Sequence, residues 1–278
     1  MEIYAQDINN HYKIYDVKKQ KIISVDDIII DMGKADVLFF GEEHNDSIGH
    51  YLEAEIFKKM DEKYPNQTSL SLEMFHTDVQ PILNEYLAGF ISEKNFIKEA
   101  RAWENYKDYK PLMEYAKQNK LKVIAANAAA RYSNAVTKNG LDILRDFPKT
   151  SRAYLPPTPI DTATGRYNDK FTEILAGHNM GSMKIYQTQN LWDATMAWSI
   201  AKFIKANKRI KVLQLNGRFH SDEKLGTLAK LQRYTAKLKI LNISSFSDES
   251  FENPDWEKFK NLADYVIITD PKVKRSYE

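Results

Sequence analysis

Short apolar runs alternate with longer segments of helical periodicity along most of the chain. Runs rich in β-favouring residues at 37–40, 68–72, 121–126, 211–216, 238–243 and 265–268 predict strands. After the first run, Ile48, Leu52, Ile56 and Met60 recur every four positions, which predicts a helix with one buried face. Strands that alternate with helices favour an α/β fold, with a mainly parallel central sheet and helices on both of its faces. Residues 12–25 precede this pattern as a short hairpin-like segment.

The pattern loosens between about residues 147 and 190, where a proline-rich stretch interrupts the periodicity. We predict a single α/β domain over residues 1–278, in which residues 147–190 form a helical cap insertion over the strand ends. The cap is rich in aromatic side chains. Tyr154, Tyr167 and Tyr186 would suit a large, flat, apolar ligand, although ordinary packing explains each of them at least as well.

Polar side chains follow the predicted strands at the points where they end. The first strand runs into Gly41, Glu42, Glu43 and His44, and the strand at 211–216 runs into Gly217 and, three residues later, His220. Two strands that each end in Gly-x-x-His are a more specific signal than either alone. In parallel sheets the carboxyl ends of strands form the ligand-binding edge, so we expect His44 and His220 to converge on one cleft if their strands are neighbours. Glu73, after the strand at 68–72, repeats this placement.

Four further residues are candidates for ligand binding, each with an ordinary alternative. His50 lies in the first turn of its helix, either at the cleft edge or exposed to solvent. Asn127 ends a strand, where it could bind a ligand or cap the next helix. Arg131 could bind a carboxylate, such as a propionate, or pair with Glu73. Asp193 lies among apolar residues of a long helix and could anchor Arg131 or a histidine.

The composition narrows the classes of function. With 278 residues, 43% of them hydrophobic, the chain can bury a full core. Its formal net charge of +2 gives no general attraction to nucleic acid. The absence of cysteine excludes disulfides and thiolate chemistry. No apolar run is long enough to cross a bilayer, and residues 1–7 show no signal-peptide pattern.

Taken in order, these motifs resemble the ChaN-like haem-binding family, which is similar to a wider group containing erythromycin esterases and TraB/Tiki proteins. The resemblance covers about residues 21–245 and rests on Gly41–His44, His50, Leu72–Phe75, Gln80, Tyr109–Leu112, Ala126–Asn127, Arg131, Gln189–Ala197 and Gly217–His220. It implies a bacterial protein of haem or iron uptake that holds haem between two monomers, with a tyrosine on the iron. Such proteins are typically lipoproteins, which implies a periplasmic or outer-membrane-anchored location. Membrane attachment would then need a lipid anchor that this sequence does not carry.

Three hypotheses for the function are therefore open, and in the third of them the polar cluster only links the strand ends to one another. The first is a haem carrier, working as a homodimer. The second is an ester or peptide hydrolase whose catalytic residues are Glu42, Glu43, His44, Glu73 and His220. In its metal-dependent form, His44 and His220, with Glu42 or Glu73, would bind zinc or manganese and activate water. In its metal-free form, His44 would act as the general base. The resemblance favours haem binding.

Overall fold

The computed structural model describes residues 8–162, 164–175 and 183–277. Within these residues, eight strands form one sheet in the order β2-β1-β8-β7-β3-β6-β4-β5. The strands are β1 Tyr12–Asp16, β2 Lys21–Ile23, β3 Val37–Glu42, β4 Thr68–His76, β5 Lys122–Asn127, β6 Lys211–Gly217, β7 Ile240–Ser247 and β8 Tyr265–Thr269. Strands β3 to β8 pair in parallel, and only β1 pairs antiparallel, with β2 and β8. The predicted mainly parallel sheet and its hairpin-like lead-in are confirmed.

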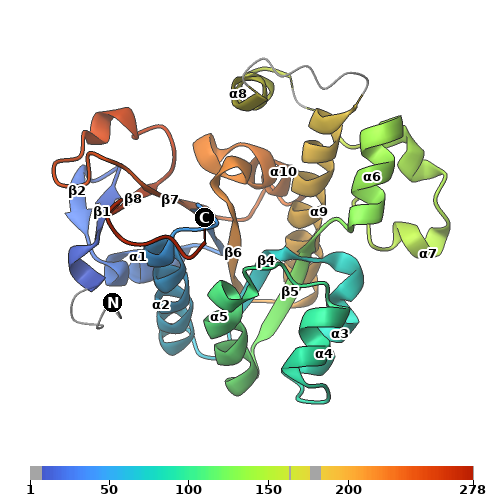
Figure 1. Cartoon of the computed structure of the whole chain (residues 1–278), viewed down its shortest axis with the longest axis horizontal. Helices are drawn as coiled ribbons and strands as arrows, with labels where there is room; N and C mark the ends of the chain where they lie inside the picture. Colours follow the sequence, from blue (N-terminus) through green and yellow to red (C-terminus); the bar gives the residue numbers. More distant parts are fainter. Residues whose placement is uncertain (1–7, 163, 176–182, 278) are drawn as a thin grey trace.

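Helices cover both faces of the sheet (Figure 1). They are α1 Val25–Asp31, α2 Ser47–Lys63, α3 Gln80–Leu87, α4 Glu93–Glu99, α5 Tyr106–Gln118, α6 Ala130–Asn139, α7 Lys149–Arg152, α8 Arg166–Leu175, α9 Ile185–Ala206 and α10 Gly226–Tyr234. Helices α1 to α5 pack against one face of the sheet, and α9 and α10 pack against the other. The α/β class predicted from the alternation of strands and helices is therefore confirmed.

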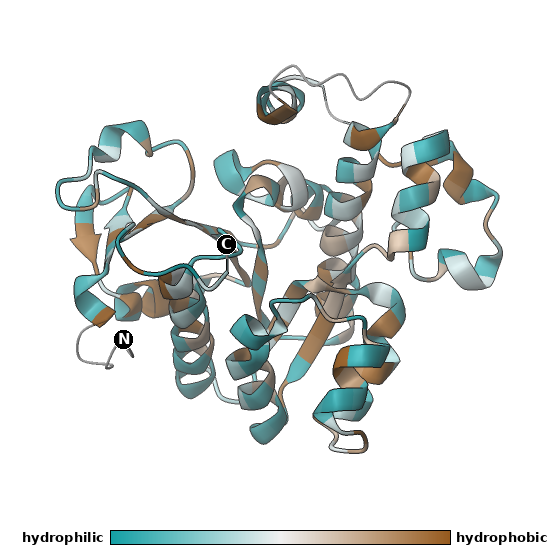
Figure 2. Ribbon diagram, viewed as in Figure 1, coloured by the Kyte–Doolittle hydropathy of each residue, from teal (hydrophilic) through white to brown (hydrophobic). Residues whose placement is uncertain are grey.

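Strand β3 is buried on both of its faces. Leu38 and Phe40 join the core beneath α2, whereas Val37 and Phe39 join the core beneath α9 and α10, and all four side chains are fully buried. Figure 2 shows the same brown, apolar interior between the two helical layers. Burying one such side chain contributes roughly 1.5–3 kcal/mol. The central strand is thereby fixed firmly, and with it the polar residues at its carboxyl end.

Strand β4 is longer than predicted. It continues to His76 rather than ending at Leu72, and its pairing with β5 shifts register between those two residues. Such an irregularity bends a strand locally and changes the direction in which a side chain points. Glu73 therefore lies within the strand, not after it, and is 6% exposed.

The predicted cap contains α7, α8 and the first turn of α9, while residues 163 and 176–182 of it lie outside the described residues. Helix α8, at the top of Figure 1, brings Phe171 and Ile174 over the ends of β3 and β6. The segments on either side of α7, through Phe147, Leu155 and Ile160, pack instead with α6 and the side of α9. In the described part of the chain, no helix combines the length and apolar character needed to span a membrane.

Candidate functional site

The two Gly-x-x-His segments meet because their strands are neighbours. Strands β3 and β6 run in parallel, with Glu42 opposite Gly217, so both histidines follow at the same edge of the sheet. They share a cavity of about 320 Å³. Its lining comes from β3, β6, α8 and α9 and consists of Glu42, Glu43, His44, Phe171, Ile174, Gln189, Gly217, Arg218, Phe219 and His220. The predicted convergence of His44 and His220 on one cleft is therefore confirmed.

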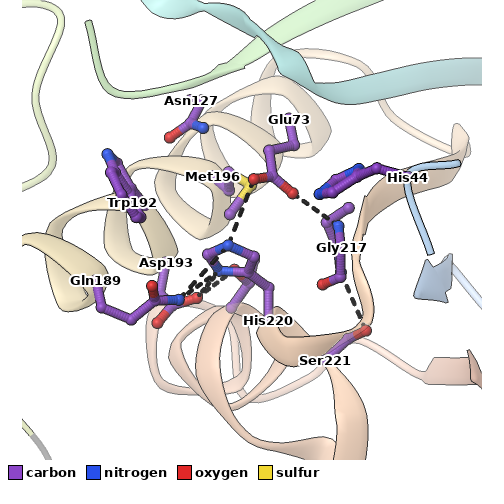
Figure 3. Close-up of polar contacts among 12 residues, drawn as sticks. His44, Glu73, Asn127, Gln189, Trp192, Asp193, Met196, Gly217, His220 and Ser221 are labelled. Atoms are coloured by element: carbon purple, nitrogen blue, oxygen red, sulfur yellow. Dashed lines mark hydrogen bonds and ion pairs between the residues drawn. The ribbon is translucent and has the colours of Figure 1, made fainter. Parts of the chain in front are cut away.

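His44 is held from behind and faces the cavity. Its Nδ1 lies 2.6 Å from Oε1 of Glu42, and the Tyr109 hydroxyl donates to the same oxygen at 2.6 Å. The ring also packs edge-on against Trp103. On the cavity side, a Cβ added to Gly217 would lie 2.7 Å from Nε2 of His44, so only glycine leaves room for the imidazole. Figure 3 shows the ring beside Gly217.

The Glu42–His44 pair favours its charged form. Burial alone would raise the pKa of Glu42, but its neighbours Glu53, His44 and His50 outweigh burial and lower it to about 2. For His44 burial acts downward, and the hydrogen bond and negative charge of Glu42 raise its pKa above the usual value. The pair is therefore a carboxylate that fixes the tautomer and orientation of a partly exposed imidazole.

His220 lies between two carboxylates (Figure 3). Its Nδ1 is 2.7 Å from Oδ1 of Asp193, and its Nε2 is 3.4 Å from Oε1 of Glu73. The other oxygen of Glu73 accepts the Gly217 N–H at 2.8 Å. Burial would lower the pKa of His220, but the two negative charges outweigh it and raise the pKa to about 10. His220 is thus a buried imidazolium. Asp193 anchors a histidine, which is one of the two roles predicted for it.

Of three other candidates, His50 is buried next to His44, whereas Glu43 and Asn127 have other partners. His50 is buried rather than exposed, since its Nδ1 lies 3.2 Å from Glu53 and its Nε2 donates to the His44 carbonyl at 3.0 Å. Glu43 lines the cavity but is bound by Arg275 at 2.9 Å. Asn127 accepts the N–H of Ala128 at 2.7 Å, but it does not cap the next helix, because the N-cap of α6 is Ala129 and no side chain caps it.

Arg131 and Tyr154 lie away from the cavity, contrary to their predicted roles. Arg131 pairs with Asp78 rather than Glu73, because helix α6 directs it toward the chain that follows β4. Tyr154 lines a different cavity, between α3, β5 and α9. Tyr167 is close to the site, but its hydroxyl donates to Asp193 at 2.5 Å and is buried. Tyr186 packs against Phe171 beside the cavity.

The predicted metal-binding set of Glu42, His44 and His220 is not assembled. Within the described residues, the group whose imidazole and carboxylate atoms all lie within 4.8 Å of one another is Glu42, His50 and Glu53. The sequence analysis missed Glu53 and Tyr109 as parts of the site. Glu53 could have been found, because it lies one helical turn after His50 and therefore on the same face of α2.

Together, the fold and the site define an α/β protein with two histidine–carboxylate clusters around a cavity at the carboxyl edge of its sheet. The family model for haem-binding uptake proteins, Tiki superfamily, ChaN, matches residues 28–231. This match covers most of the chain, so the chain belongs to the ChaN family of haem-binding uptake proteins, as the order of its motifs predicted.

One solved structure shows the same fold, and two others are more distantly similar. A structure described as cofacial heme binding to ChaN of Campylobacter jejuni is 21% identical, with a TM-score of 0.70, and the match covers 94% of this chain and 98% of that one. An erythromycin esterase mutant in its open conformation is 12% identical, with a TM-score of 0.49 and coverage of 94% and 83%. The type III effector HopBA1 is 15% identical, with a TM-score of 0.48 and coverage of 88% and 93%. No curated protein sequence matches this chain.

Proposed function

We propose that this protein binds haem in the cavity between β3 and β6, with Nε2 of His44 as the iron ligand. One observation carries the proposal: His44 presents Nε2 to the cavity while Glu42 holds its Nδ1, in a chain of a haem-binding family. Histidine ligates haem iron in many proteins, and a carboxylate behind a ligating imidazole fixes its tautomer and raises its basicity. Bound haem would supply iron for bacterial haem or iron uptake.

The residues around His44 fit a flat, anionic ring. Phe171, Ile174 and Phe219 form an apolar wall of the cavity. Arg218 lines the same cavity, and its guanidinium also pairs with Asp222 at 2.9 Å. The His220 imidazolium is a second positive charge at the cavity, beside the carboxylates of Asp193 and Glu73. The apolar wall suits the ring of haem, and the cations suit its propionates.

A tyrosine ligand, which the family resemblance implies, has less support here. Burial and the Asp193 carboxylate raise the pKa of Tyr167 well above its usual value, so its phenolate form is disfavoured. Tyr154 belongs to another cavity. Tyr186, which lies beside the cavity, is the tyrosine that an experiment must compare with His44.

We extend the proposal to a homodimer in the periplasm or on the outer membrane, where a lipid anchor would provide attachment. A cavity of about 320 Å³ is at the lower end of the range for small-molecule sites, roughly 300–1,000 Å³, so part of a haem would stay outside it. Ile174 at its rim is 64% exposed. A second copy would cover this apolar rim and the outer face of the haem, and the cofacial haems named for the C. jejuni structure support such an arrangement.

The hydrolase hypothesis has weaker support from the same geometry. A general base must be neutral. Although burial opposes it, the hydrogen bond and negative charge of Glu42 raise the pKa of His44, the proposed base, and so favour its protonated form. The metal-dependent form needed Glu42, His44 and His220 around one ion, and these residues are not so arranged.

Titration of hemin into the purified protein tests the proposal. We expect a shifted Soret band that saturates, that His44→Ala loses, and that Tyr186→Phe and Tyr154→Phe keep. Tyr154→Phe is the matched control because that residue lies in a different cavity. Sedimentation with and without hemin tests the dimer, and fractionation of the native bacterium tests the location. Failure of the wild-type protein to bind hemin would refute the function, whereas loss of the band only in Tyr186→Phe would refute the assigned ligand.

A further inference from the structure

A second polar cluster lies behind the cavity, on the side of β3 that faces α2. His50 is in the first turn of α2, Glu53 is one turn later on the same face, and Glu42 is at the end of β3. All three side chains are buried, with exposures of 7%, 0% and 0%. Neither the haem proposal nor the packing of the helix requires two carboxylates and an imidazole at this point.

Two carboxylate oxygens of this cluster lack a hydrogen-bond partner. Oε1 of Glu42 receives Tyr109 and contacts His44, but its Oε2 has no hydrogen bond, and neither has Oε1 of Glu53. A buried carboxylate oxygen without a hydrogen bond is costly, so such atoms are rare in proteins unless a proton or a cation satisfies them. A metal cation between the two glutamates would satisfy these oxygens.

The tautomer of His50 directs a lone pair toward the same point. Its Nε2 donates to the His44 carbonyl at 3.0 Å, and Asp108 lies 3.8 Å away on that side, so the ring proton belongs on Nε2. Nδ1 then faces the two glutamates. This is the usual arrangement of a metal-ligating histidine, whose other nitrogen donates to a carbonyl or carboxylate.

The spacing of the three donor atoms also suits a metal ion. Nδ1 of His50 lies 3.5 Å from Oε2 of Glu42 and 3.2 Å from Oε2 of Glu53. Ligands about 2.0–2.2 Å from a tetrahedral ion stand about 3.4 Å from one another. Both glutamate oxygens are therefore already close to the separation from His50 that coordination requires, and all three donor atoms lie within 4.8 Å of one another.

We propose that Glu42, His50 and Glu53 form a binding site for a divalent first-row metal ion such as Mn²⁺ or Zn²⁺, separate from the haem cavity. One imidazole and two carboxylates without a thiolate suit these ions, and the chain contains no cysteine. Glu42 is the link between the sites, because its Oε1 holds His44 while its Oε2 faces the metal donors. Metal binding would thus fix the carboxylate that orients His44.

Equilibrium dialysis of haem-free protein against MnCl₂ or ZnCl₂, followed by elemental analysis, tests the proposal independently of haem binding. We expect about one equivalent of metal in the wild type and affinity at least about 100-fold weaker in Glu53→Gln and His50→Gln, since even outer-shell changes cost 10–100-fold. Glu73→Gln is the matched control: it removes a buried strand-end carboxylate from the other histidine and should keep the metal.

A wild-type measurement keeps the proposal testable if those variants fail to fold. Electron spin echo spectroscopy of the Mn²⁺ complex should detect the nitrogen of one coordinated imidazole. Wild-type protein that retains less than about a tenth of an equivalent of either metal, a Mn²⁺ spectrum without nitrogen coupling, or a folded Glu53→Gln that binds metal normally would each overturn the site. Hemin binding in the absence of metal binding would leave the proposed function intact while refuting this inference.

Discussion

Replacing His220 with asparagine tests the electrostatics of the site most directly. The imidazolium of His220 is the positive charge between the buried carboxylates of Glu73 and Asp193. Without it, both carboxylates remain buried with fewer partners. Removal of one member of a buried charged group typically destabilises a protein by about 3–5 kcal/mol.

The raised pKa of His220 gives an independent magnitude. It rises from 6.5 to about 10, and at about 1.36 kcal/mol per pKa unit the folded state gains about 5 kcal/mol from the charged ring. The two routes agree in order of magnitude. We therefore expect His220→Asn to lower the free energy of unfolding by about 3–5 kcal/mol at pH 7.

The pH dependence of this loss follows from the direction of the shift. A pKa that is raised on folding contributes stability that is fully present below the unfolded value, near 6.5, and disappears as the pH rises through about 10. The difference between wild type and His220→Asn should therefore be large at pH 6–7 and shrink toward pH 10.

Urea unfolding followed by circular dichroism at pH 6, 7, 9 and 10 measures this difference. His11→Asn is the matched control, because His11 also contacts a carboxylate, Asp270, at 2.9 Å but is 28% exposed. It should cost no more than about 1 kcal/mol. A His220→Asn loss below about 1 kcal/mol at pH 7, or one that does not change with pH, would refute the reasoning.

Three other perturbations address the cavity and its support. Although burial opposes it, Glu42 raises the pKa of His44 above its usual value near 6.5. Because iron needs the neutral ring, hemin affinity should begin to fall above that pH and continue to fall as the pH decreases. A Soret titration unchanged from pH 8 to 5 would contradict this. Gly217→Ala places a Cβ 2.7 Å from the His44 Nε2 and should weaken hemin binding roughly fivefold, because displacing a side chain from its rotamer costs about 1 kcal/mol. An unaltered affinity would count against His44 as the ligand. Tyr109→Phe removes a hydrogen bond to Glu42 and should cost about 1.5–3 kcal/mol in urea unfolding, whereas a cost under 0.5 kcal/mol would show that this bond is dispensable.

The fold and the centre of the site could be predicted because local pattern determines both. A short apolar run bounded by glycine can be buried on both faces only as a central strand, and the polar residues after it must then lie at the sheet edge. His44 and His220 follow from this reasoning, provided that β3 and β6 are neighbours. That pairing itself had no local signal, since it depends on how the intervening helices pack.

The failures have a common physical origin. Arg131 and Tyr154 were assigned from residue type, but a long side chain can reach several partners, and the direction of α6 and of the segment after α7 decides which. The ion pair of Arg131 with Asp78 joins the first turn of α6 to the short 3-10 helix Thr77–Val79 after β4, and no periodicity encodes their relative position. Glu53 was missed for the opposite reason: its position on α2 was predictable, but a glutamate there is read as solvated unless the helix face is followed residue by residue.

The neighbours of β3 also determine when the protein can fold. Val37 pairs with Val212 on one side and with Ile240 on the other, so both partners are synthesised long after β3 itself. Until then both edges of the apolar strand β3 are unpaired, and unpaired strand edges readily pair with other chains. Such distant pairing also slows folding, because large loops must close before the contacts form. A fragment that ends before residue 211 should therefore aggregate rather than yield a smaller working unit, and the newborn chain depends on protection until its last quarter has emerged.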